Sequence, residues 1–160
     1  MVVSNATPLI AFARIGQFPL LRKVVGRLVI PGAVADEISS YTRSRKGVID
    51  LQQEQDWINV QSVQSDAQVQ LLLPTLDRGE AEVIALALEQ QARLVLIDEL
   101  TGRKVAESLN LNIAGSVGIL IRAKQMGEIS AIKPLLDEMK KQGIYFSQRF
   151  IDTVLQEVKE

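Results

Sequence analysis

The sequence contains no cysteine and no histidine among its 160 residues. Without cysteine, the protein can have no disulfide framework, no thiolate metal site and no thiol nucleophile. Without histidine, it lacks the commonest general base and the usual zinc ligand, and a Ser-His-Asp mechanism is excluded. Chemistry must therefore come from carboxylates, amides, hydroxyls, lysine and arginine. Such an oxygen-rich set suits Mg²⁺ or Mn²⁺ and poorly suits Zn²⁺ or Cu²⁺.

The sequence also lacks a strong charge of either sign and a long apolar run. Its formal net charge is −1, so the whole chain does not have the basic character typical of nucleic-acid-binding domains. The apolar stretches fall far short of the ~20 residues that a membrane span needs. The first residues lack the basic start and apolar stretch of a signal peptide. We therefore expect a cytoplasmic protein that is not bound to a membrane.

The overall composition is that of one soluble globular domain. Hydrophobic residues make up 47% of the chain and charged residues 23%, which argues against disorder. The length suits one domain with a substantial core, and no linker, repeat or change in composition divides it. The sequence predicts a single domain over residues 1–160.

Apolar strand-like runs alternate with helical patterns along the chain. The expected strands cover residues 1–4, 27–30, 94–97 and 111–114, with an edge strand at 57–63 and a short β-like piece at 145–146. Helical spacing covers residues 8–15, 18–25, 32–40, 50–56, 80–91, 102–109, 117–126, 129–142 and 150–158. Residues 41–47 are polar and basic, as in a loop or frayed helix end. This alternation predicts an α/β fold with a mostly parallel sheet flanked by helices.

Acidic or amide residues follow several of the apolar runs. They are Asn5, Glu37, Glu80, Asp98 and Glu99. In an open parallel sheet the ligand crevice lies at the carboxyl ends of the strands, so these side chains should converge. Converging carboxylates repel one another unless a cation or protons lie between them. The pattern therefore predicts a divalent-metal site.

Each of these residues also has an ordinary structural interpretation. Asp77 and Glu80 have the spacing of a capping box, which is compatible with a site at the same helix start. Glu82 is the competing carboxylate on that helix. Asp98 leaves its strand first and is the better ligand candidate, whereas Glu99 can point outward or begin the next helix. Glu37 borders the buried face of its helix, where a carboxylate is usually just solvated.

The remaining polar candidates have similar alternatives. Asn5 can ligate a hard cation through its carbonyl or cap the helix near residue 8, which Thr7 could also cap. Ser116 lies in a Gly-Ser-x-Gly turn whose backbone donors could bind an anion. Two basic groups could contact phosphates or form a solvated surface: Arg43, Arg45 and Lys46, and Arg103 with Lys104. No Walker loop or dinucleotide fingerprint is present.

Taken together, these motifs resemble a PIN domain, the small metal-dependent nuclease fold. The resemblance covers nearly the whole chain and is carried by four segments in order. They are Val2-Val3-Ser4-Asn5-Ala6-Thr7-Pro8-Leu9-Ile10, Pro31-x-x-Val34-x-x-Glu37, Asp77-Arg-Gly-Glu80-Ala-Glu82, and Leu96-Ile97-Asp98-Glu99 with Arg103-Lys104-Val105-Ala106. The prokaryotic branch that the chain resembles most consists of proteins described as predicted nucleic-acid binders.

The resemblance implies a Rossmann-like parallel sheet and a cluster of acidic residues that binds Mg²⁺ or Mn²⁺. By position, the metal site would comprise Asn5, Glu37, Glu80 and Asp98, with Glu82 and Glu99 as neighbours. Glu37, Glu80 and Asp98 would be the catalytic carboxylates, and Thr7 and Ser116 would orient water or phosphate. The resemblance further implies cleavage of RNA, a homodimer, and a toxin of a type II toxin–antitoxin pair inhibited by a small antitoxin protein.

One position departs from the PIN pattern, because the first motif normally carries Asp where this chain has Asn5. The change removes a negative charge and should lower metal affinity. Three hypotheses therefore follow: a metal-dependent endoribonuclease, a PIN-like module with weakened catalysis that binds RNA or a protein, and a Mg²⁺-dependent phosphatase. Asn5 counts against the phosphatase, because an aspartyl nucleophile would be needed at that strand end.

Overall fold

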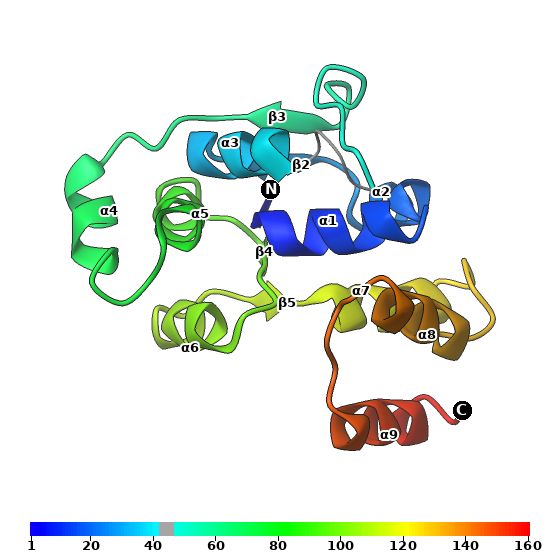
Figure 1. The fold of residues 1–160 in the computed structure, drawn as a ribbon. Helices are drawn as coiled ribbons and strands as arrows, with labels where there is room; N and C mark the ends of the chain where they lie inside the picture. The colour runs from blue at the N-terminus through cyan, green and yellow to red at the C-terminus, as the bar shows by residue number, and fades with distance from the viewer. Residues whose placement is uncertain (42–46) are drawn as a thin grey trace.

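A computed structural model describes residues 1–41 and 47–160 of the protein. Five strands form one parallel sheet in the order β3-β2-β1-β4-β5 (Figure 1). The strands are β1 (Val2–Ser4), β2 (Leu28–Ile30), β3 (Ile58–Val60), β4 (Leu94–Leu96) and β5 (Ile113–Ala114). The predicted α/β fold is confirmed. The strand order reverses between β1 and β4, and ligands bind at such a switch point in open parallel sheets.

Helices connect the strands and surround the sheet (Figure 1). They are α1 (Ala6–Arg14), α2 (Phe18–Val25), α3 (Gly32–Tyr41), α4 (Asp66–Leu72), α5 (Arg78–Glu89), α6 (Leu100–Ser108), α7 (Ser116–Gln125), α8 (Lys133–Lys141) and α9 (Gln148–Glu157). Within residues 1–41 and 47–160, no helix has the length and apolar character to cross a membrane.

The sheet is buried by its flanking helices, which explains its apolar composition. Every residue of β1 and β2 is buried, as expected for central strands of a parallel sheet. Helix α5 packs on β1 and β4 and also on α3 and α4. Most of its residues are buried, from Glu80 to Ala87. The start of α5 is thereby held at the carboxyl edge of the two central strands.

Three local predictions were wrong or incomplete. Residues 51–57 form turns and not the predicted helix, although Asp50 Oδ1 accepts the N–H groups of Gln52 and Gln53 in the manner of a helix cap. Residues 145–146 are irregular, because the described sheet ends at β5 and offers them no neighbouring strand. Helix α4 was not predicted, although Ser65 caps it by accepting the N–H of Gln68.

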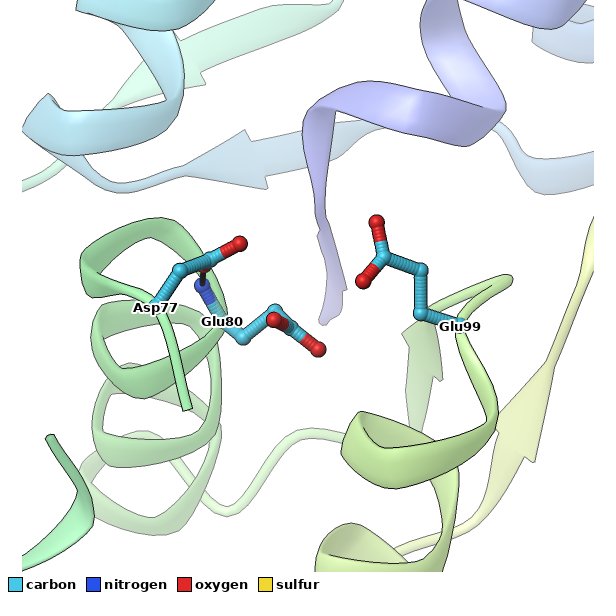
Figure 2. Close-up of side chains that lie close together, drawn as sticks. All are labelled: Asp77, Glu80 and Glu99. Atoms are coloured by element: carbon cyan, nitrogen blue, oxygen red, sulfur yellow. Dashed lines mark hydrogen bonds between the residues drawn. The ribbon is translucent and has the colours of Figure 1, made fainter. Parts of the chain in front are cut away.

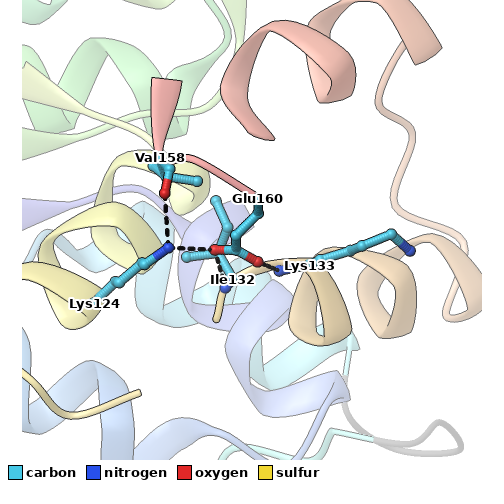
Figure 3. A network of polar contacts seen from close by, with 5 residues as sticks. All are labelled: Lys124, Ile132, Lys133, Val158 and Glu160. Atoms are coloured by element: carbon cyan, nitrogen blue, oxygen red, sulfur yellow. Dashed lines mark hydrogen bonds and ion pairs between the residues drawn. The ribbon is translucent and has the colours of Figure 1, made fainter. Parts of the chain in front are cut away.

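The last residues are fastened to α7 and α8. The carboxylate of Glu160 accepts hydrogen bonds from the backbone N–H groups of Ile132 and Lys133, at 2.8 and 3.1 Å, and from Lys124 Nζ at 2.9 Å (Figure 3). Lys124 Nζ also donates to the carbonyl of Val158 at 2.8 Å. Burial acts to raise the pKa of Glu160, but these donors outweigh it and hold the pKa below its ordinary value. The segment that carries α9 is therefore tied down at its far end.

Candidate metal centre

The site is built around the first turn of α5. Asp77 is the N-cap residue, and its Oδ1 accepts the backbone N–H of Glu80 at 2.8 Å. This bond satisfies one of the N–H groups that a helix start leaves free. The predicted helix cap at Asp77 is therefore present. Because the cap fixes the first turn, it also fixes the direction in which Glu80 leaves the helix.

Three carboxylates converge beside this turn. Oxygen atoms of Asp77, Glu80 and Glu99 all lie within 4.8 Å of one another. Figure 2 shows Asp77 and Glu80 at the start of α5 and Glu99 at the start of α6, with their carboxyl groups turned toward the same space. We call these three residues the acidic cluster. Glu99 joins it because it is the N-cap residue of α6 and leaves the end of β4 toward α5.

Glu80 is the buried member of the acidic cluster. It is 4% exposed, and within the described part of the chain its Oε2 has no hydrogen-bond partner. Burial, with the neighbouring Asp77 and Glu99 carboxylates, raises the pKa of Glu80 from its ordinary 4.5 to about 7. A buried carboxylate needs a proton or a cation to offset the loss of hydration.

Glu37, from α3, lies at the rim of the acidic cluster. Its side chain is exposed, and its pKa is raised by partial burial and by the charges of Asp77 and Glu99. Glu37 therefore experiences the negative charges of Asp77 and Glu99. A cation placed among these groups would relieve the repulsion that all of them experience.

Asn5 borders the same region from the end of β1. It is 4% exposed, and its backbone N–H donates to the carbonyl of Leu96 on β4 at 2.9 Å. Asn5 occupies the N-cap position of α1 but makes no capping bond with its side chain to the described residues. A Cβ on Gly79 would lie 3.5 Å from both Asn5 Oδ1 and Asp77 Oδ1, so the amide oxygen lies beside the start of α5. Thr7 lies two residues further on, in the first turn of α1, and is half-buried.

Asp98 takes a different role from the acidic cluster. Its two carboxylate oxygens accept the backbone N–H and the hydroxyl of Ser116, each at 2.6 Å. Gly115, the N-cap residue of α7, has no side chain to cap that helix. The sequence indicated that the helix start at Ser116 could bind an anion. The carboxylate of Asp98 occupies that position.

This geometry gives a prediction for Asp98→Ala. Ser116 is 1% exposed, so its N–H would lose its partner in a buried place. We expect a loss of about 1–2 kcal/mol in the free energy of unfolding, as for other helix caps, together with a loss of Mn²⁺ affinity if Asp98 is also the metal ligand that the sequence predicts. Urea unfolding and calorimetric Mn²⁺ titration would measure the two effects. Unchanged stability with loss of Mn²⁺ binding would assign Asp98 to the metal instead.

The other predicted site residues lie outside the acidic cluster. Glu82 accepts the N–H of Ala33 at 3.1 Å and pairs with Arg78 at 3.2 Å, which joins α5 to the start of α3. Arg103 Nη1 donates to the carbonyl of Ile97 at 3.0 Å, and Lys104 is exposed. Arg43, Arg45 and Lys46 lie outside the residues that the structure describes.

Two residues of the site, Asp77 and Gly102, were not predicted as site residues from the sequence. Asp77 was interpreted only as a cap, although a carboxylate that caps through one oxygen retains another for a ligand. Gly102 was placed only in a helix, but a Cβ at this position would overlap Glu80 Oε2 and lie 3.1 Å from Ile97 Cγ2. Gly102 lies four residues after Asp98, which follows the end of a strand. A glycine in such a place can indicate that another group approaches the backbone closely.

The residues present fit a hard divalent cation. All of the converging donors are carboxylate oxygens, which suit Mg²⁺ and Mn²⁺. The unpartnered, buried Oε2 of Glu80 is the observation that most requires a positive partner. The arrangement defines an α/β protein with an acidic site at the switch point of its sheet.

A comparison with models of protein families identifies the family to which this α/β protein belongs. A family model described as DUF3368, a PIN domain, matches residues 1–160. The chain therefore belongs to the PIN domain family, as its motifs indicated. The search of curated proteins gave no match.

Proposed function

We propose that this PIN domain protein is a metal-dependent endoribonuclease. The observation that carries the proposal is the acidic cluster, with the buried and unpartnered Glu80 oxygen at its centre. Asp77, Glu80 and Glu99 would hold Mg²⁺ or Mn²⁺, with Glu37 and Asn5 at the rim. When bound, the cation would supply activated water and neutralise charge on the scissile phosphate.

The residues of the chain contribute binding and orientation. Asp77 keeps the first turn of α5 in place and so aims Glu80. Glu37, whose pKa is raised by burial and by the charges of Asp77 and Glu99, would act as a further carboxylate beside the cation. The family resemblance supports a more specific role: a toxin of a type II toxin–antitoxin pair that acts on RNA as a homodimer and is inhibited by a small antitoxin.

A second candidate is a PIN module that binds RNA or a protein without efficient catalysis. Two observations favour it. Asn5 removes a charge from the first motif, and Asp98 directs both carboxylate oxygens to Ser116. Fewer carboxylates free to face a cation would weaken metal binding.

The experiment that separates these candidates is cleavage of end-labelled single-stranded RNA by the full chain. We expect cleavage with Mn²⁺ and none with EDTA. Asp77→Asn should reduce the rate at least about tenfold, because a charge is lost from the metal site. Asparagine caps helices as well as aspartate does, so the fold should be kept.

Asp66→Asn is the matched control, since Asp66 is an exposed acid in the first turn of α4. This variant should cleave like wild type. Metal-independent RNA binding without cleavage would reject the nuclease and support the binding module.

A further inference from the structure

A large cavity opens beside the acidic cluster. Its volume is about 880 Å³, and its wall comprises parts of α1, α6, α7 and α9 with the segment before α9. Glu99 belongs both to this wall and to the acidic cluster. A ligand in the cavity would therefore lie next to a group that is bound at the carboxylates.

The cavity is lined by apolar and aromatic side chains, with charged side chains of both signs among them. Three aromatic residues line it from the C-terminal side: Tyr145, Phe146 and Phe150. Tyr145 is 85% exposed and Phe150 45% exposed. The rings of Phe146 and Phe150 are stacked, with centroids 6.2 Å apart. Exposed apolar side chains that gather beside a cavity are typical of an interaction site.

Charges of both signs line the wall: Arg14 and Arg103 are positive, and Asp98, Glu99 and Glu157 are negative. Arg14 Nη1 donates to the carbonyl of Gln142 at 2.9 Å, which holds the guanidinium near the start of the aromatic segment. Aromatic faces combined with arginine are the features by which proteins bind single-stranded nucleic acid.

The aromatic segment is held in place before any ligand arrives. Its N-terminal side follows α8, and its C-terminal side runs through α9 to Glu160, which is tied to α7 and α8 (Figure 3). A backbone held on both sides of the rings loses less freedom when a ligand binds than a free segment would.

We propose that this cavity is a nucleobase subsite, in which an unpaired base next to the scissile phosphate stacks on Tyr145 and Phe150. The proposal rests on the proposed nuclease function and assigns the side chains that hold the base beside the scissile phosphate. A base within a duplex is stacked on its neighbours and cannot enter a cavity of this kind. The cavity volume lies within the range of about 300–1,000 Å³ that is usual for sites binding small ligands.

The test is binding of a short single-stranded RNA that contains the fluorescent base 2-aminopurine, with EDTA present to prevent metal-dependent cleavage. We expect fluorescence quenching on wild type. Tyr145→Ala should bind about tenfold more weakly, as is typical when a stacking ring is lost. Because Tyr145 is 85% exposed, its removal should not unfold the protein, and Tyr145→Phe should restore binding.

Leu71→Ala is the matched control, because Leu71 is 81% exposed on α4 and does not line the cavity. It should bind RNA like wild type. Equal binding by wild type and Tyr145→Ala, equal binding of an abasic oligonucleotide, or no saturable binding by wild type would each overturn the subsite. If the separate Mn²⁺ assay showed cleavage alongside any of these results, the nuclease proposal would stand and only the subsite would fail. Quenching in EDTA, with no cleavage in the Mn²⁺ assay, would reject the nuclease and keep a base-binding site.

Discussion

Replacing Glu80 with Gln is expected to stabilise the metal-free protein at pH 8 and to abolish its response to Mn²⁺. The pKa of Glu80 is 4.5 ordinarily and about 7 in the folded state. Between these values the folded state binds more protons than the unfolded state, so stability falls as the pH rises through this window. Above about pH 7 the full cost of the buried charge is present. It amounts to about 3 kcal/mol, from a rise of about 2.5 pKa units at about 1.4 kcal/mol each.

Glutamine carries no charge, so Glu80→Gln should not show this loss. Urea unfolding in EDTA should find the variant more stable than wild type at pH 8, by roughly 1–3 kcal/mol, and the difference should shrink toward pH 5. With Mn²⁺ at a hundred times its dissociation constant, wild type should gain about 2.7 kcal/mol, and the variant much less. Cleavage of RNA should be lost together with the metal response.

Glu107→Gln is a suitable control, because Glu107 is an exposed acid on α6. It should follow wild type in both pH and Mn²⁺ dependence. If Glu80→Gln were less stable than wild type at pH 8, or were stabilised by Mn²⁺ to the same extent, Glu80 would not be the buried centre of a metal site.

The sheet and the start of α5 were predictable because local sequence determines them. Apolar runs such as Val2–Ser4 and Leu94–Leu96 have few other ways to be buried, and the Asp77–Glu80 spacing is a local capping pattern. The resemblance to the PIN domain family added the order of the motifs along the whole chain, and the family match confirmed it.

The membership of the acidic cluster depends on contacts between distant segments. Asp98 and Glu99 are adjacent in sequence, yet Asp98 contacts Ser116 whereas Glu99 joins Asp77 and Glu80. The choice between them follows from where α7 begins relative to β4, which periodicity does not describe. The metal assignments of Asn5, Glu37 and Asp98 therefore stay predictions.

Substituting Gly102 with alanine is expected to disrupt metal binding although every acidic residue of the site is kept. The Cβ of alanine would overlap Glu80 Oε2, so the carboxylate has to rotate away from its neighbours in the acidic cluster. We expect Mn²⁺ affinity to fall by about tenfold to a hundredfold, the range seen when residues that orient a ligand are changed. The replacement favours the helix by up to about 1 kcal/mol, while overpacking against Glu80 and Ile97 costs about 1–3 kcal/mol.

The two terms oppose each other, so the fold should survive with at most modest destabilisation, and calorimetric Mn²⁺ titration should isolate the effect on the site. Gly118→Ala provides the matched control on α7, because its Cβ would meet Ala114 Cβ at an ordinary 3.6 Å. This control should keep wild-type Mn²⁺ affinity and gain a little stability. Wild-type Mn²⁺ binding by Gly102→Ala would mean that the buried oxygen of Glu80 does not face the metal, since that oxygen is the atom the new methyl group displaces.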